Sequence, residues 1–191
     1  VVFYNLSNYY HQAQLTWMEY PGLGSPSLSL IAAKPTLFLF SFLQKVGIPG
    51  FLVQAGVMWF LLVSSGIGIY LLVKELFPKL PDRYLLLGVF FYWFNPISLV
   101  DVWNRFLLNY IFFFALLPVG SYLYIKGLKG RRYFWALLLN ISLFSFSYVF
   151  SYIAFSILFW IWVSLITFFY ALFDKNRKSK IFSLKYFLTV V

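Results

Sequence analysis

The sequence predicts an all-α fold, a polytopic bundle of transmembrane helices, and two observations predict it. Of the 191 residues, 62% are hydrophobic and 25% are aromatic, whereas only 10% are charged. A soluble domain has roughly 45–50% apolar and about 25% charged residues, so this chain has too few charges to cover a water-facing surface. The formal net charge is +10, and the basic residues stand between long apolar runs. That placement is typical of membrane topology and argues against nucleic acid as a partner.

The same composition excludes two other classes of protein. A disordered chain is excluded because 25 Phe and 15 Tyr residues supply far more apolar surface than such chains carry. The absence of cysteine excludes disulfide bonds and thiolate metal sites, but it identifies no compartment.

Five complete spans and the start of a sixth can be placed on apolar runs of the length that a bilayer requires. The expected ranges are 53–73, 84–100, 107–125, two helices within 133–173, and 181 onward. The run 133–173 has no charged residue and is roughly twice as long as the bilayer core needs. We therefore expect a tight turn at 145–151, where serines cluster. In the first span, small residues are expected to let a neighbouring helix approach closely, and these are Ser64, Ser65, Gly66 and Gly68.

The links between these spans alternate in charge. Basic residues fill the links 74–83, 126–132 and 174–185, whereas the links near 95–105 and 147 are poor in them. The positive-inside rule predicts that the three basic links are cytoplasmic. The other links, together with residues 1–34, are then expected on the non-cytoplasmic side of a cell membrane.

Residues 35–46 are too short an apolar run to cross the membrane. We expect them to form an interfacial or re-entrant helix on the outer side, started by Pro35. The organisation predicted is a single transmembrane domain over 1–191, with an outer loop at 1–34 and the bundle at 53–191. Because the chain lacks an initial Met and stops within an apolar segment, we expect an internal piece of a longer protein.

The outer segment 1–34 holds much of the polar side-chain chemistry of the chain. His11 is of the residue type most often used for proton transfer, and Glu19 is a candidate base or metal ligand near Trp17. Two glycines and two prolines within 20–26 predict a rigid turn next to them. Asn5 begins an N-glycosylation triplet. The alternative is an ordinary solvated loop with a structural turn.

A second candidate site follows the break that Pro96 predicts. Proline disfavours helix at Asn95, and the freed backbone groups then need partners, which suits a substrate-lining break. Asp101 and Arg105 are four residues apart and can pair on a helix, with Asn104 beside them. Arg105 can bind phosphate or carboxylate with two hydrogen bonds. The alternative is an interfacial ion pair next to a tryptophan anchor.

The order of these features resembles a known family. Five features follow one another along the chain: Trp17, the Gly-Leu-Gly-Ser-Pro turn at 22–26, the short helix after Pro35, the span ending at 68–74, and the step Asn-Pro-Ile-Ser-Leu at 95–99. This order resembles the amino-terminal half of GT-C-type membrane glycosyltransferases, in particular the arabinofuranosyltransferase-like and YfhO-like proteins. The likeness covers nearly the whole chain, and its motifs are short.

The resemblance implies transfer of a sugar from a polyprenyl-phosphate-linked donor to a glycan acceptor on the non-cytoplasmic face. It implies a key Asp in the first outer loop, yet residues 1–81 contain none. Either that acid lies upstream of Val1, or Glu19 replaces it, or the protein is not catalytic. A divalent cation, Mg or Mn, is the cofactor implied. His11 and Trp17 would contact sugar or acceptor, and Arg105 would bind the lipid phosphate.

One other function fits the sequence, and a third fits it poorly. The protein can be a non-catalytic transmembrane subunit or scaffold, whose partners are membrane lipid, the rest of its own chain or other membrane subunits. A transporter would predict inverted repeats and charges within the membrane, and the sequence has neither.

Overall fold

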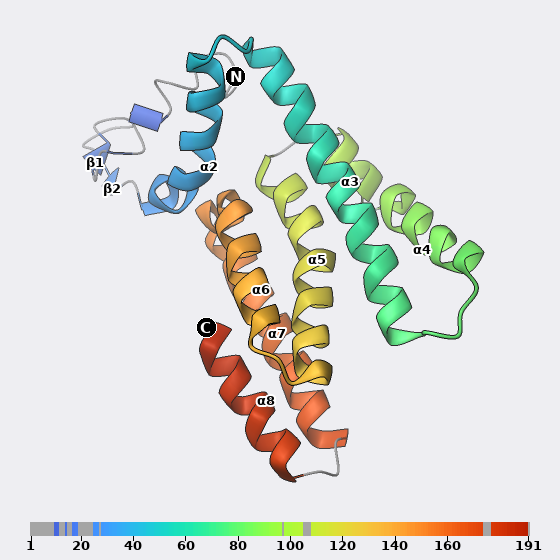
Figure 1. Cartoon of the computed structure of the whole chain (residues 1–191). Coiled ribbons are helices and arrows are strands. Elements are labelled where there is room, and N and C mark those ends of the chain that lie inside the picture. Colours follow the sequence, from blue (N-terminus) through green and yellow to red (C-terminus); the bar gives the residue numbers. More distant parts are fainter. Residues whose placement is uncertain are drawn as a thin grey trace.

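The computed structural model describes residues 10–11, 14, 17–18, 25–26, 28–96, 98–104, 108–173 and 177–190. The fold is all-α, as predicted, and its helices run antiparallel beside one another (Figure 1). Two short strands of two residues each pair at one edge. The pair joins β1 (Trp17–Met18) to β2 (Ser25–Pro26) in antiparallel register.

Three helices are long and apolar enough to cross a membrane: α3 (Gly50–Leu76), α5 (Leu108–Gly130) and α7 (Ile153–Phe173). At 27 residues α3 is about 40 Å long, more than the roughly 30 Å of a bilayer core. These helices contain the expected spans 53–73 and 107–125 and the second half of the run 133–173. The three helices make this an integral membrane protein.

The run 133–173 is divided as predicted. Helix α6 (Phe134–Ser145) ends at a short 3₁₀ turn, η2 (Ser147–Ser151), and α7 then returns beside it. At 12 residues α6 is only about 18 Å long, shorter than the roughly 30 Å of the hydrocarbon core. If α6 starts at one face of the core, it therefore ends inside the core, and η2 lies within the membrane. A non-helical backbone at that depth needs to be covered by protein.

Helix α2 (Leu28–Lys45) provides the cover. The structure contradicts the expected start at Pro35, because the helix begins seven residues earlier and Pro35 lies inside it. Membrane helices tolerate an internal proline more readily than soluble ones. Thr36 and Ser147 are buried and share a hydrogen bond of 3.0 Å between their side-chain oxygens, which fixes α2 across η2.

The segment expected as one span at 84–100 is broken. Helix α4 (Asp82–Phe94) ends before Asn95, and a seven-residue π-helix, η1 (Ser98–Asn104), follows it. The break falls where Pro96 predicts it. Helix α4 packs on the outside of α3, with most of its apolar side chains exposed.

Small residues of α3 bring its neighbours close, as predicted. A side chain at Gly66 would lie 2.6 Å from the Trp93 ring of α4, and one at Gly68 would lie 2.8 Å from Val119 of α5. Trp93 Nε1 also donates a 3.0 Å hydrogen bond to Ser65 Oγ. In a membrane this close packing and hydrogen bonding replace the hydrophobic effect as the force that joins helices.

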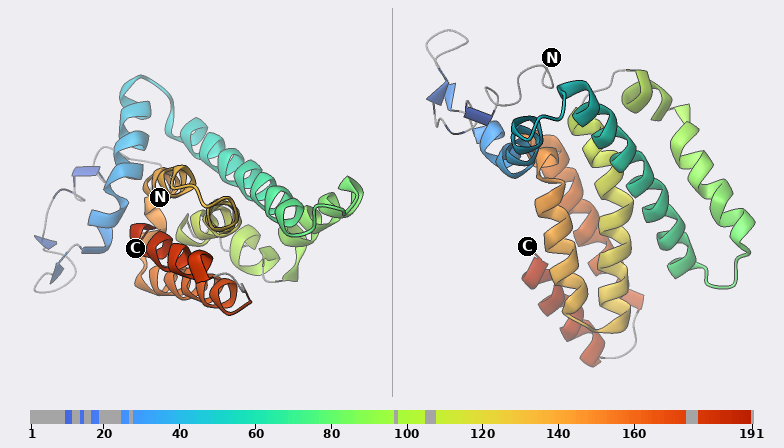
Figure 2. Two further views of the ribbon diagram at one scale, coloured as in Figure 1. Left: turned by 60° about the horizontal axis from the view of Figure 1, so that its bottom comes forward. Right: turned by 45° about the horizontal axis from the view of Figure 1, so that its top comes forward.

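Helix α5 is the centre of the bundle, with α3 on one side and α6 and α7 on the other (Figure 2). Its Ser121 accepts a 2.8 Å hydrogen bond from Trp162 Nε1, and its Tyr124 shares one with Thr167. Helix α8 (Arg177–Val190) packs against α7, and its buried Tyr186 ring sits over Gly127 of α5. The core is thus built around α5, which α3, α6, α7 and α8 contact.

Candidate functional site

The two ends of the bundle differ in chemistry. The last turns of α3, α5 and α7 lie at one end, and the last turns of α4 and α6 lie at the other (Figure 1). Ion pairs join two of these ends, since a carboxylate oxygen of Glu75 in α3 lies 3.4 Å from Lys129 Nζ and another lies 3.9 Å from Lys126 Nζ in α5. We call this the basic end, and the opposite end the η2 end.

The break between α4 and η1 lies at the η2 end and is held by a small polar network. Asn95 Nδ2 donates hydrogen bonds to the Tyr92 carbonyl oxygen (2.9 Å) and to Ser98 Oγ (2.7 Å). The backbone N–H of Ser98 donates to Asn95 Oδ1 at 3.0 Å, and Ser98 Oγ donates to the Tyr92 carbonyl oxygen at 2.7 Å. The two side chains therefore satisfy backbone groups that the end of α4 and the start of η1 would otherwise leave unpaired.

A cavity of about 340 Å³ opens beside this network. Its walls come from the end of α4, from η1, and from the first turns of α5 and α7. The lining residues are Tyr92, Asn95, Ser98, Val102, Tyr110, Phe113, Phe114, Leu117 and Phe155. The size is within the range of small-molecule pockets, and the combination of apolar walls with a few polar groups is typical of them.

The aromatic walls of this cavity are fixed by contacts with one another. Tyr92 stacks on Phe114 with ring centroids 4.2 Å apart, and its hydroxyl donates a 2.7 Å hydrogen bond to the Phe114 carbonyl oxygen. Phe155 stacks on Phe113 at 4.8 Å and meets Tyr110 edge-on at 4.7 Å. A carbonyl in α5 is free for Tyr92 because Pro118, four residues after Phe114, lacks the N–H that would bond to it. The cavity is therefore a preformed feature of the helix packing.

The residues predicted around the break are only partly brought together. Asn95 lines the cavity, but its amide is already engaged in the local network. Asp101 and Asn104 lie on η1 by their backbone, and their side chains lie outside the described part of the structure. Arg105 is outside the described residues, so its pairing with Asp101 stays a prediction.

The residues predicted in the outer loop lie elsewhere. His11 is exposed, and Trp17 is placed by its backbone in β1. The β1–β2 pair lies next to α2, and α3 stands between this part of the molecule and α4 (Figures 1 and 2). The structure does not bring Trp17 next to Asn95. Asn5 and Glu19 are outside the described residues.

A metal site does not form among the described residues, where no three His, Asp or Glu side chains lie close enough to share an ion. Glu19, the candidate metal ligand within this chain, lies outside the described residues, so the expected Mg or Mn ion stays a prediction.

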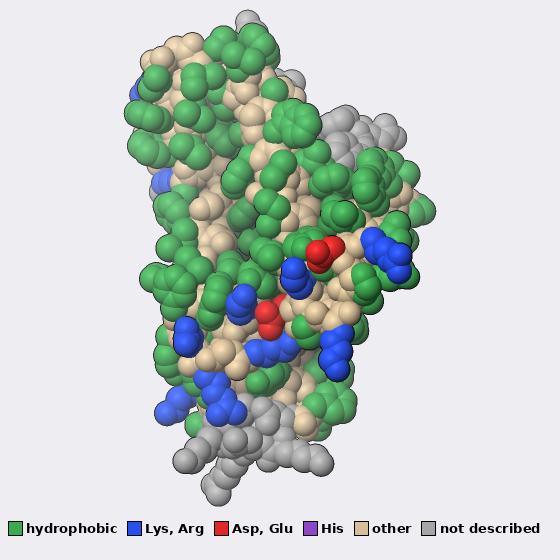
Figure 3. Space-filling view, turned by 45° about the vertical axis from the view of Figure 1, so that its right-hand side comes forward, with side chains coloured by type: hydrophobic (Ala, Val, Ile, Leu, Met, Phe, Trp, Pro, Cys, Tyr) green, Lys and Arg blue, Asp and Glu red, His purple; other side chains and the backbone are tan. Residues whose placement is uncertain are grey.

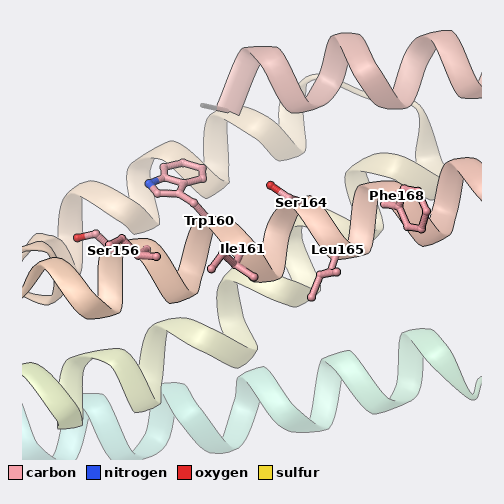
Figure 4. Close-up of a pocket in the computed structure, with 7 residues that line it drawn as sticks. Ser156, Trp160, Ile161, Ser164, Leu165 and Phe168 are labelled. Carbon is pink, nitrogen blue, oxygen red and sulfur yellow. The ribbon is translucent and has the colours of Figure 1, made fainter.

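A second groove, of about 520 Å³, runs along the outer face of α7 (Figure 4). All of its lining side chains come from this one helix, among them Ser156, Trp160 and Ser164. A groove on one apolar helix faces lipid in a membrane, and it has no second wall with which to grip a ligand. The cavity beside η1 is the better site, because four segments enclose it.

Most of the cavity lining was missed by sequence reasoning. Ser98 could have been found, because a serine three residues after an Asn-Pro step is placed to pair with the asparagine side chain. Tyr110 and Phe155 carry no such signal, since they reach the cavity only through the packing of α5 and α7.

The fold and this cavity define a class: a helical integral membrane protein with a broken segment that lines a cavity at one end of the bundle. Comparison with protein families, with curated proteins and with solved structures finds no match for this chain.

Proposed function

We propose that this chain is the membrane-embedded part of a glycosyltransferase that takes its sugar from a polyprenyl-phosphate-linked donor on the non-cytoplasmic side. The observation that carries this proposal is the cavity beside η1, at the end of the bundle opposite the basic links. A lipid-linked donor presents an apolar chain next to a phosphate. Aromatic walls suit the chain, and Arg105 just beyond η1 suits the phosphate.

The proposal includes an orientation. The basic end is cytoplasmic by the positive-inside rule, so the cavity opens toward the non-cytoplasmic side. Helix α4 with η1, and α6 with η2, complete two further crossings besides α3, α5 and α7. This makes five crossings, with α8 the start of a sixth. In this arrangement α2 is the re-entrant element of the outer side.

The other predicted residues take their roles from the resemblance. Arg105 binds the donor phosphate, with Asp101 and Asn104 orienting it. Glu19 is the candidate acid, and His11 and Trp17 contact the sugar or the acceptor glycan.

Two variants test the proposal in membranes that contain the whole protein. Arg105→Ala is expected to abolish transfer from polyprenyl-phosphate-linked sugars to acceptor glycan. Leu117→Trp fills the cavity and is expected to block crosslinking of a photoactivatable polyprenyl phosphate, whereas Ser164→Trp on the α7 groove leaves it unchanged. Full transfer activity in Arg105→Ala, or equal crosslinking in both tryptophan variants, would contradict the proposal.

A non-catalytic subunit or scaffold is the second candidate, and one observation favours it. The amide of Asn95 is engaged by Tyr92 and Ser98, so this cavity residue has a sufficient structural role without a substrate. A scaffold predicts that Arg105→Ala leaves sugar transfer in the membrane unchanged while a partner subunit or another segment of its own chain stays bound.

A further inference from the structure

The two acidic side chains described at the basic end, Glu75 and Asp82, both form ion pairs with lysines. Asp82 lies 3.6 Å from Lys74, and Glu75 pairs with both Lys126 and Lys129. Lys129 Nζ also donates a 2.7 Å hydrogen bond to the Glu75 backbone oxygen. These contacts tie the end of α3 to the start of α4 and to the end of α5.

Four exposed cations of the α3–α4 link, the first turn of α4 and the α5–α6 turn have no ion pair to any other described residue. They are Lys79, Arg83, Arg131 and Arg132. The space-filling view shows Lys and Arg side chains gathered here around the two acids (Figure 3). Because α3 and α5 are joined through Glu75, the α3–α4 link and the α5–α6 turn belong to one surface, which we call the cationic surface.

Apolar side chains stand next to these cations. The link after α3 forms a hollow of about 460 Å³, lined by Leu76, Phe77, Pro78, Lys79 and Leu80. Phe77 is 59% exposed and Leu80 is 39% exposed. A surface that offers cations and a hydrophobic hollow side by side matches a molecule with an anionic head and an apolar tail. It does not match a small soluble anion, which has no apolar part to bury in the hollow.

We propose that the cationic surface binds anionic phospholipid, with Lys79, Arg83, Arg131 and Arg132 contacting headgroup phosphate and the hollow at 76–80 holding the start of an acyl chain. The location supports lipid as the partner, because the surface lies where α3 and α5 leave the apolar part of the bundle. Basic groups at such a boundary attract anionic lipid, and arginine is suited to bidentate phosphate contacts. The proposal stands independently of the proposed sugar transfer.

The test measures how strongly the whole protein prefers phosphatidylglycerol to phosphatidylcholine, by native mass spectrometry of the protein with bound lipid. The wild-type chain is expected to prefer phosphatidylglycerol, and the preference is expected to fall with salt. Neutralising one cation by Lys79→Gln, Arg131→Gln or Arg132→Gln should weaken the preference about fivefold, and the triple variant should remove most of it. Lys34→Gln with Lys45→Gln, on α2 at the other end, is the matched control and should keep it.

Two further arms separate lipid binding from a simpler attraction of anions. Phe77→Ser is expected to weaken binding of phosphatidylglycerol while leaving the charge unchanged, and circular dichroism checks that its helix content is native. Inorganic phosphate in excess is expected not to displace the lipid. Displacement by phosphate, an unchanged preference in the triple variant, or an equal loss in the α2 control would overturn the proposal.

Discussion

At the scale of single residues, Gly127 is a position where the packing leaves no room for a side chain. A Cβ there would overlap the hydroxyl and ring of Tyr186, which is fully buried between α5 and α8. Tyr186 is also held by rings on three sides, from Tyr124, Tyr133 and Phe182, so it has little freedom to move away.

We expect Gly127→Ala to destabilise the protein by about 2 kcal/mol, because overpacking forces α8 off α5. The free energy of unfolding in detergent micelles, titrated with sodium dodecyl sulfate, measures this. Gly56→Ala is the control, since nothing lies within 4 Å of a side chain at that position of α3. Its effect should stay below about 1 kcal/mol. Equal effects of the two variants would show that the packing of Tyr186 does not require glycine at position 127.

Asn95 illustrates what sequence reasoning could and could not establish about the site. The effect of Pro96 on the preceding residue is local, so the sequence predicts that the helix breaks there, and the structure ends α4 at Phe94. The partners of the Asn95 side chain are also within three residues. The cavity itself is not local: Phe155 reaches it from α7, and no pattern in a single sequence places those two residues together.

At the scale of elements, α2 is the clearest correction. Proline at the first turn is a common helix start, and on that basis the sequence predicts a helix from Pro35. The structure begins α2 at Leu28 and carries it through the proline. The contact with η2 at Thr36 holds the middle of this helix in place, one residue beyond the proline. A helix-start preference that depends on one residue type therefore gave the wrong first residue for α2.

The hydrogen bond between Thr36 and Ser147 predicts a measurable coupling between α2 and η2. Thr36→Val and Ser147→Ala, separately and together, should give a coupling of about 0.6 kcal/mol in the free energy of unfolding, the average for side-chain hydrogen bonds between membrane helices. Thr36→Val paired with Ser145→Ala is the control cycle, because Ser145 is exposed and donates to the Ile141 oxygen of its own helix. A coupling no larger than that of the control would mean that apolar packing alone holds α2.

At the scale of the whole molecule, the distribution of charge agrees with the arrangement of the helices. The alternation of basic and non-basic links was a pattern along the sequence, and it required successive helices to run in opposite directions. The structure arranges α3, α5 and α7 in one direction with α4, α6 and α8 returning between them (Figures 1 and 2). The ion pairs from Glu75 to Lys126 and Lys129 hold two basic links together that are far apart in sequence.

This arrangement predicts the sidedness of individual positions, and the absence of native cysteine makes single-cysteine labelling direct. Val46→Cys and Tyr152→Cys lie at the η2 end, where these side chains are 64% and 48% exposed. They should react with a membrane-impermeant maleimide in intact cells. Leu80→Cys and Arg132→Cys, at the basic end, should react only after permeabilisation. The reverse pattern would keep the antiparallel bundle but invert its orientation, and would therefore place the cavity beside η1 on the cytoplasmic side, where the proposed donor would not reach it. Labelling of Leu80→Cys and Tyr152→Cys from the same side would contradict the bundle itself, because α3, α5 and α7 would then no longer cross the membrane in one direction.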